Sequence, residues 1–224
     1  MVQFPNGRSN GGLTGAERRA DARRTEILRA ASRTFREKGF AATGMRDIAA
    51  HADLSPGILY HYFRGKHELL YFCQDRSLDR MQDALEAARR SGEPATEQLR
   101  RVIVAHVLCL LDELEGSAAH LEVDALPAKL RARIVEKRDR YEQGIRRLLA
   151  AGVQKGELVD CDATLVARAI LGALNWSARW FRPDGPSSPA DVADALARYL
   201  VRGLASGAQT RKLSLKSPMP RGVA

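Results

Sequence analysis

Four polar side chains that can bind nucleic acid lie in a short stretch of this 224-residue sequence. Arg46 can pair with the edge of a guanine or with a phosphate, and His61 can meet a base edge. The hydroxyls of Tyr60 and Tyr62 suit phosphate oxygens, although either ring could instead simply pack inside the protein. The chemistry that these groups suggest is binding, not catalysis. Which contacts they can make depends on the elements that position them.

The surrounding residues have the pattern of a helix-turn-helix. Four apolar residues at helical spacing predict a short first helix: Met45, Ile48, Ala49 and Ala52. Asp53 can take the left-handed conformation of a helix exit. Ser55 can then cap a second helix, with Pro56 at its first position and Leu59 and Phe63 on its buried face. In such motifs the second helix enters the DNA major groove.

The residues of this stretch resemble the TetR/AcrR family of transcriptional regulators. A helix-turn-helix pattern alone is a weak signal. The run Leu59-Tyr60-His61-Tyr62-Phe63, followed by Lys66 and Glu68-Leu69-Leu70, is a specific one. Two residues depart from the family pattern, since Asp53 stands where Gly is usual and Gly65 where Ser or Asn usually caps a helix. Gly caps almost as well, so we expect a small local cost and no change of fold.

The resemblance implies a DNA-binding role for the motif. It directs residues 60–62 toward DNA, and Gly57 would let the backbone approach closely. It also implies that Lys66 holds a phosphate, while Thr43 could cap its helix and touch phosphate. The predicted DNA-binding residues are Thr43, Arg46, Ser55, Gly57, Tyr60, His61, Tyr62 and Lys66.

A second distinctive run is Trp176-Ser177-Ala178-Arg179-Trp180-Phe181-Arg182-Pro183-Asp184-Gly185-Pro186. It resembles a subgroup of the same family that responds to acyl-CoA thioesters. An Arg between two Trp on an apolar helix could hold a carbonyl, a carboxylate or a CoA phosphate beside an acyl chain. The alternative is that the Trp side chains fill a core or an interface and Arg179 forms a structural ion pair. The predicted effector-binding residues are Trp176, Arg179 and Trp180, and the effector is a small hydrophobic molecule, with acyl-CoA as the specific hypothesis.

Catalytic and metal-binding patterns are weak. The one metal-like group in the sequence has a spacing unlike that of known sites, so we expect no metal and no cofactor; its members are His106, His120, Glu122 and Asp124. The sequence contains no GxSxG, P-loop or GxGxxG motif and no convincing pairing of a nucleophile with a base. We therefore expect no catalytic residue and no enzyme.

Charge and cysteine content narrow the class of protein. The formal net charge is +9, and residues 1–68 hold 12 Lys and Arg against 7 Asp and Glu. That excess fits phosphate binding, although RNA or a membrane surface would fit basic charge equally well, so the motif carries the inference. Three dispersed cysteines without a CxxC motif argue against disulfides and zinc. With no signal peptide and no long apolar run, we expect a cytoplasmic protein that does not span a membrane.

Helical periodicity continues through the chain, and no strand pattern or internal repeat occurs. We predict an all-α fold of about nine helices, with a three-helix DNA-binding domain followed by a helical ligand-binding and dimerisation domain. The predicted segments are a disordered arm at 1–13, the DNA-binding domain at 14–66, the second domain at 67–206 and a disordered basic tail at 207–224. Outside the motif, helices are predicted at 17–38, 66–90, 96–114, near 120–126, and at 128–154, 163–181 and 189–204.

The last two predicted helices have wide apolar faces with Ala and Gly. The resemblance implies that they pair with their copies in a homodimer, which suits a palindromic operator. We therefore expect a repressor that leaves a double-stranded DNA operator when its effector binds, through different affinities for two spacings of the DNA-binding domains. The alternatives are an activator or nucleoid-type binder without ligand, and a soluble multidrug-sequestering protein whose DNA-binding part is vestigial.

Overall fold

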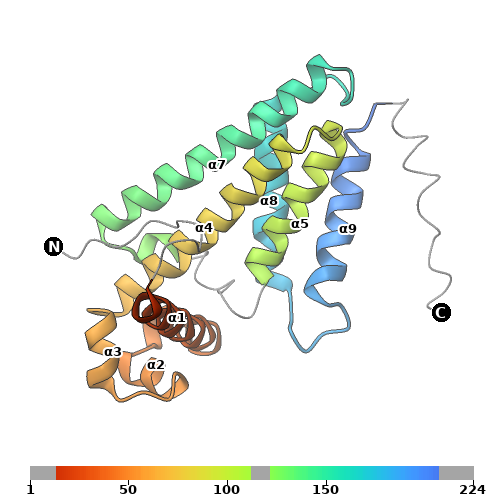
Figure 1. Ribbon diagram of the computed structural model, residues 1–224. Helices are drawn as coiled ribbons and strands as arrows, with labels where there is room; N and C mark the ends of the chain where they lie inside the picture. The colour runs from red at the N-terminus through yellow and green to blue at the C-terminus, as the bar shows by residue number, and fades with distance from the viewer. Residues whose placement is uncertain (1–13, 112–121, 207–224) are drawn as a thin grey trace. The chain divides into compact units, whose positions relative to one another are not determined.

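The chain forms helices throughout the part that the structure describes. In the computed structural model, which describes residues 14–111 and 122–206, there are eight α-helices, one 3-10 helix and no strand (Figure 1). This confirms the all-α prediction. In chain order the elements are α1 (Gly15–Ala42), α2 (Met45–His51), α3 (Pro56–Tyr62), α4 (Lys66–Arg90), α5 (Ala95–Leu111), η1 (Val123–Ala125), α7 (Ala128–Gln154), α8 (Ala163–Trp180) and α9 (Pro189–Arg202).

Some predictions fall outside the described residues. These are the arm at 1–13, the tail at 207–224, the last residues of the helix predicted at 96–114, and His120 and Leu121 of the predicted short helix. None of the helices in the described ranges combines the length and the apolar character that a membrane crossing needs.

The ends of α1 follow from its capping residues. Thr14 Oγ1 accepts the Glu17 N–H at 3.3 Å, and the Glu17 carboxylate accepts the Thr14 N–H at 2.7 Å. This capping box satisfies two backbone donors at the helix start. The helical geometry breaks at Gly39, whose φ of 76° is readily adopted only by glycine, and a last turn runs on to Ala42. The helix predicted at 17–38 therefore spans Gly15–Ala42, and its predicted end falls directly before the break at Gly39.

The bounds predicted for α4 and α7 agree with the structure. The carbonyl of Gly65 accepts the Leu69 N–H at 3.2 Å, so Gly65 occupies the cap position before α4. At the start of α7, the Pro127 carbonyl accepts the Arg131 N–H at 2.9 Å. Proline suits this place because the first helical residues have no intrahelical use for an N–H.

The described chain divides into two compact units. The first takes the residues up to Arg80 and those between Cys109 and Lys137; the second takes those from Met81 to Leu108 and from Arg138 onward. The boundaries fall inside α4, α5 and α7. Whether residue 66 ends a functional domain stays a prediction.

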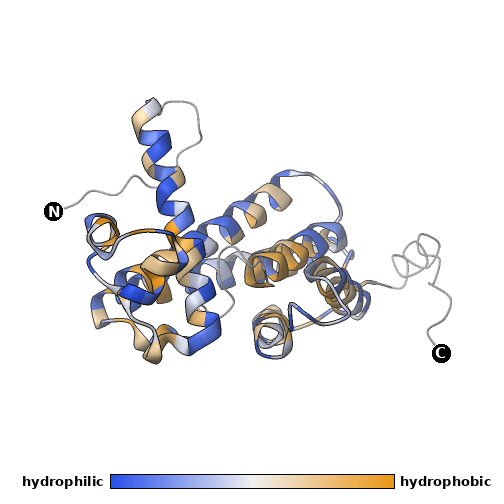
Figure 2. Ribbon diagram, turned by 90° about the horizontal axis from the view of Figure 1, so that it is seen from below, coloured by the Kyte–Doolittle hydropathy of each residue, from blue (hydrophilic) through white to orange (hydrophobic). Residues whose placement is uncertain are grey.

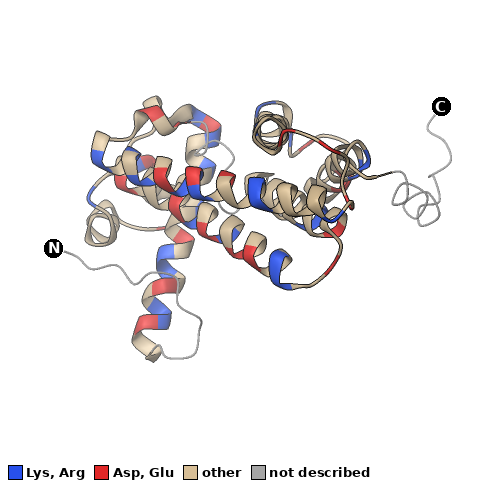
Figure 3. Ribbon diagram, turned by 90° about the horizontal axis from the view of Figure 1, so that it is seen from above, with Lys and Arg blue, Asp and Glu red and all other residues tan. Residues whose placement is uncertain are grey.

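In the first unit, α1 packs on α2 and α2 packs on α3. Its core begins at Ile27, so the preceding turns of α1 are mostly exposed. These turns are largely hydrophilic (Figure 2) and carry interleaved basic and acidic residues (Figure 3). An ion-pair cluster joins α7 to α4, because Lys137 Nζ lies 2.5 Å from Asp75 Oδ1 and 2.7 Å from Asp79 Oδ1. Burial lowers the pKa of Lys137, but the two carboxylates outweigh it and the pKa is raised. The core residues of α1 to α4 include Ile27, Phe35, Ile48, Leu59, Phe63, Leu69 and Leu70.

In the second unit, a glycine lets α7 approach the start of α5. A Cβ on Gly152 would lie 2.6 Å from Leu158 Cδ1 and 2.7 Å from Ala95 Cβ, so only glycine fits without movement. After α7 the chain turns back to the end of α9, where the Val159 N–H donates to the Leu204 carbonyl at 2.9 Å. The buried residues that α8 and α9 contribute include Ala167, Ile170, Leu174, Val192, Ala193, Ala197 and Val201.

Candidate nucleic-acid interface

The turn before α3 has the geometry that the sequence predicts. Asp53 has a φ of 52° and is the one non-glycine residue of the described ranges with positive φ. Asp53 therefore does take the left-handed conformation at the end of α2. Ser55 Oγ then accepts the Ile58 N–H at 3.3 Å, with Pro56 at the first helical position. Both capping predictions are confirmed, and together they fix where α3 begins.

The outward side of α3 forms the surface that we call the recognition face, made of Gly57, Ile58, Tyr60 and His61. Leu59 and Phe63 are buried beneath it, as predicted. Tyr60 and His61 are exposed, whereas Tyr62 is partly buried with its ring edge-on to the His61 ring, 5.7 Å between centroids. The structure thus exposes Tyr60 and His61 to a partner more fully than it does Tyr62.

Two further features of the recognition face concern its shape. A Cβ on Gly57 would meet only Ser55 Oγ, at 4.0 Å, so packing among the described residues does not require glycine there. Ile58 is 47% exposed, and the sequence reasoning, which looked for polar groups, missed it. Its position directly before buried Leu59 was the available signal. An exposed aliphatic side chain on such a helix suits the methyl group of thymine.

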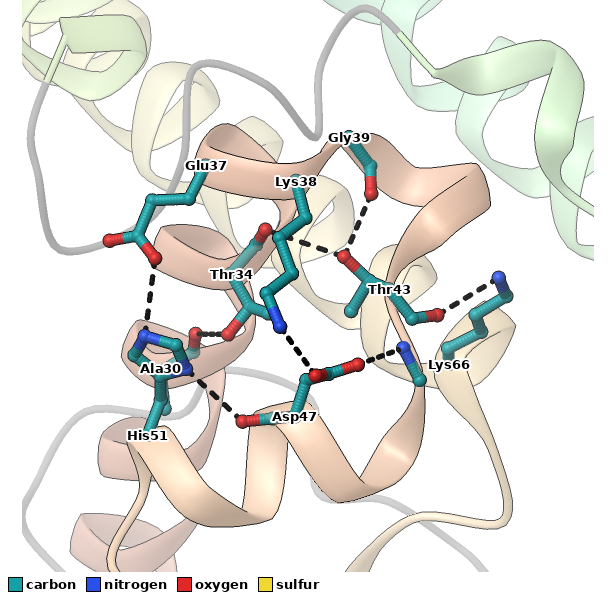
Figure 4. A network of polar contacts seen from close by, with 10 residues as sticks. Ala30, Thr34, Glu37, Lys38, Gly39, Thr43, Asp47, His51 and Lys66 are labelled. Atoms are coloured by element: carbon teal, nitrogen blue, oxygen red, sulfur yellow. Dashed lines mark hydrogen bonds and ion pairs between the residues drawn. The ribbon is translucent and has the colours of Figure 1, made fainter.

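Thr43 lies between α1 and α2 and faces inward. Its side chain is 2% exposed, and Thr43 Oγ1 lies 2.7 Å from the Gly39 carbonyl, to which it donates (Figure 4). The N-cap of α2 is Gly44, so the prediction that Thr43 caps this helix is wrong. Its backbone N–H instead closes α1 by donating to the Phe40 carbonyl. A phosphate contact by Thr43 stays a prediction, which the burial of its hydroxyl does not favour.

Lys66 has three partners inside the protein. Its Nζ donates to the carbonyls of Phe40, Ala41 and Thr43, each at 3.0 Å, and lies 4.7 Å from the centre of the Phe40 ring. Figure 4 shows the contact with Thr43. The contact predicted between Lys66 and a phosphate stays a prediction, and the structure gives the ammonium group another role.

The same network holds α2 on α1. Asp47 accepts the Gly44 N–H at 2.8 Å and pairs with Lys38 at 2.5 Å; these contacts, that to Lys38 first, lower the pKa of Asp47. Arg46, one residue earlier, is exposed and has no ion pair with any residue in the described ranges. Arg46 therefore remains available to a ligand.

The predicted effector residues lie on the outward side of α8, which we call the α8 stripe. Trp176 is 63% exposed, Trp180 is half exposed, and the Arg179 guanidinium carbon lies 5.9 Å from the centre of the Trp176 ring. The structural ion pair weighed for Arg179 has no acidic partner within residues 14–111 and 122–206. The α8 stripe consists of Leu165, Arg168, Ala169, Gly172, Asn175, Trp176, Arg179 and Trp180.

The α8 stripe is unlike an ordinary solvated helix face. Leu165 lies at its first end and Trp176 and Trp180 near its other end, with Ala169 and Gly172 between them. A Cβ on Gly172 would meet nothing within 4 Å, so the chain itself leaves this space open. On α9, Tyr199 is 77% exposed. Large exposed aromatic residues are enriched in surfaces that a second chain covers.

His106 is part of a buried polar cluster that joins three helices. Its Nδ1 lies 3.3 Å from Tyr141 Oη of α7, and its Nε2 lies 3.3 Å from Asn175 Oδ1 of α8. Burial lowers the pKa of His106 to about 4, against the raising effect of Asn175 and with the positive charge of Arg138 nearby. Of its sequence neighbours in the metal-like group, His120 lies outside the described residues. Within those residues no group of three His, Cys, Asp or Glu side chains is arranged to hold a metal.

Two family descriptions match the chain. Residues 27–71 match "Bacterial regulatory proteins, tetR family", and residues 76–204 match "Tetracyclin repressor-like, C-terminal domain". The first match begins at Ile27, where the core of the first unit begins. The second match alone covers more than half of the 224 residues.

Individual proteins are similar over most of their length. The HTH-type transcriptional repressor KstR2 of Rhodococcus jostii is 30% identical over 191 residues, covering 82% of this chain and 92% of that repressor. The structure of PfmR from Thermus thermophilus has a TM-score of 0.72 at 36% identity, covering 79% of this chain and 97% of that one. The structure of AibR with isovaleryl coenzyme A and operator DNA has a TM-score of 0.66 at 24% identity, covering 80% and 98%.

Proposed function

The chain belongs to the TetR family of bacterial regulatory proteins, and from this premise we propose that it is a homodimeric transcriptional repressor released from its operator by a small hydrophobic effector. The observation that carries the proposal is the recognition face of α3, a short helix that presents Ile58, Tyr60 and His61 outward on a capped and buried base. A binding role without catalysis agrees with relatives that are named as regulators.

Each exposed group of the recognition face has a role that suits its chemistry. We assign base contacts to His61 and Ile58, the latter to a thymine methyl, and phosphate contacts to Tyr60 and Arg46. Gly57 would allow the backbone of α3 to come close to the DNA. Tyr62 and Ser55 contribute less directly, since one is partly buried and the other caps the helix.

Dimerisation places two recognition faces on one operator, and the α8 stripe supports it. In a two-fold dimer the same surface of both chains meets itself. The small residues Ala169 and Gly172 would let helices approach closely, with Trp176 and Tyr199 supplying buried area. The operator should then be a palindrome whose half-sites are one or more helical turns apart.

For the effector we propose a hydrophobic acid, with acyl-CoA thioesters as the class to test first. Arg179 could bind a negatively charged head group, because its side chain is exposed and has no acidic partner in the described ranges. Trp176 and Trp180 offer apolar surface beside it. AibR, which shares the fold, has been solved with isovaleryl coenzyme A and operator DNA together. Because the same two Trp residues are exposed on the α8 stripe, a dimer contact competes with the effector role.

The test begins with the operator. Duplexes selected from a random pool by the purified protein should converge on a palindrome, and a gel shift should show tight binding to it. A panel of acyl-CoA esters should then contain at least one that binds in calorimetry and releases this DNA. Arg179→Ala should lose the release while keeping DNA affinity. Binding of hydrophobic cations without selection of any DNA sequence would instead favour a sequestering protein.

A further inference from the structure

Lys66 stands at the first position of α4, and its side chain reaches back to the end of α1. All three of its carbonyl acceptors lie within residues 40–43, more than twenty residues earlier in the chain. A lysine ammonium has three protons to donate and no more. Three acceptors at 3.0 Å therefore account for its whole donor capacity.

The chemistry of this place explains why a cation belongs there. The last carbonyls of a helix have no partner within the helix and carry partial negative charge. Phe40 and Ala41 lie in the last turn of α1, directly after the break at Gly39. The Phe40 ring adds a cation–π contact and itself packs against the rings of Phe35 and His67. A phosphate could take this ammonium only by breaking its contacts with these three carbonyls.

We propose that Lys66 is a positioning residue that locks the start of α4 to the connection between α1 and α2, and does not hold a DNA phosphate. The lock fixes residues 40–44, from which α2 and then α3 continue, and so sets the angle at which the recognition face meets DNA. Movement at the start of α4 would pull on the same carbonyls. This inference rests on the proposed function, but its first test needs no DNA.

The first test is lysine acetylation of the wild-type protein, read by mass spectrometry. Lys66 should react at least tenfold more slowly than the exposed Lys129 and Lys155 in the free protein. Addition of the selected operator should give Lys66 no further protection. A Lys66 that reacts like Lys129 when free and becomes protected by DNA would overturn the proposal. Failure of the protein to select any DNA would instead count against the proposed function, without altering the free-protein result.

The second test compares Lys66→Met with Arg46→Met, an exposed cation in the same motif. Loss of one phosphate contact lowers the slope of log affinity against log salt by about 0.9. Arg46→Met should show this decrease. Lys66→Met should keep the slope, lose about tenfold in operator affinity, and lose little affinity for a random duplex. Its backbone amides at residues 42–48 should exchange faster with deuterium.

The conservative variant Lys66→Arg separates charge from geometry. A planar guanidinium keeps the charge but cannot direct three N–H donors from one nitrogen atom to three carbonyls. If Lys66 positions α1 and α2, Lys66→Arg should lose nearly as much operator affinity as Lys66→Met. If it held a phosphate, Arg would restore binding, and that outcome would refute the lock. Circular dichroism of both variants identifies any that does not fold, and for such a variant the acetylation result decides.

Discussion

Asp53 holds a backbone conformation that costs most side chains energy. Glycine adopts a φ of 52° freely, whereas Asp does so at a smaller penalty than other residues. Asp53→Gly should therefore stabilise the protein by about 0.5–1 kcal/mol, and Asp53→Ala should destabilise it by about 1 kcal/mol. Urea denaturation measures both. Equal stability of the two variants would show that the turn relaxes out of the left-handed region.

His106 makes stability depend on pH. Its pKa is about 4 in the folded protein and near 6.5 when exposed, so the unfolded chain takes up the proton first as pH falls. The free energy of unfolding should therefore decrease between pH 6.5 and pH 4, by at most about 3 kcal/mol. His106→Gln has no such proton to gain. The difference in unfolding free energy between wild type and His106→Gln should shrink across this range, and a constant difference would contradict it.

Residue roles were predictable where the cause is local. Ser55, Pro56 and Asp53 act on their immediate neighbours, and the structure confirms all three. Lys66 and Thr43 act through carbonyls far along the chain or turn inward, and no spacing rule reveals those partners. Ile58 was missed for another reason, because a polar pattern alone does not disclose an exposed aliphatic residue on a binding surface.

The packing of α7 on its neighbours gives a prediction at the level of elements. Gly152→Ala would place a methyl group within 2.6–2.8 Å of Leu158 and Ala95. This overpacking should cost about 1–2 kcal/mol, after allowance for the better helix propensity of Ala. Thermal unfolding followed by circular dichroism checks it.

Gly57→Ala is the matched control, since its methyl would meet only Ser55 Oγ at 4.0 Å. Its stability should be equal to or slightly above wild type, while its affinity for the operator should fall if the backbone of α3 comes close to DNA. A Gly152→Ala protein as stable as Gly57→Ala would mean that α7 can move away from α5.

Helix bounds were the most predictable feature, because caps and breaks depend on residues within a few positions of the helix end. Pro127 and Gly65 mark the starts of α7 and α4 because proline lacks a donor and glycine can cap. The kink at Gly39 shows the remaining difficulty. After the break the helix makes one more turn. Lys66 donates to carbonyls of that turn, and a residue so far along the chain is invisible to a local pattern.

The whole molecule is expected to act as a dimer through the α8 stripe. Trp176→Asp places a charge on a side chain that the single chain leaves largely exposed. It should yield a folded monomer that no longer binds a palindromic operator tightly. Light scattering gives the mass and circular dichroism the helix content.

Lys155→Glu, an exposed change at the end of α7, serves as the control and should remain dimeric. If the Trp176→Asp protein is still dimeric but responds to no effector, Trp176 binds the effector and does not form the dimer contact. The sequence could not decide between these roles, because an apolar helix face looks the same whether its cover is a ligand, the same chain or a second copy.

The first unit is larger than its helix-turn-helix, and this limits how DNA specificity can be exchanged between relatives. Leu69, Leu70 and Cys73 of α4 are buried, and the Ser32 hydroxyl of α1 lies 3.5 Å from Cys73 Sγ. A recombination joint at residue 66 would keep Lys66 but place foreign residues against α1. A joint beyond Arg80 would still separate α4 from the stretch Cys109–Lys137. New operator preferences should therefore arise more readily by substitution at Ile58 and His61 than by transfer of the whole motif.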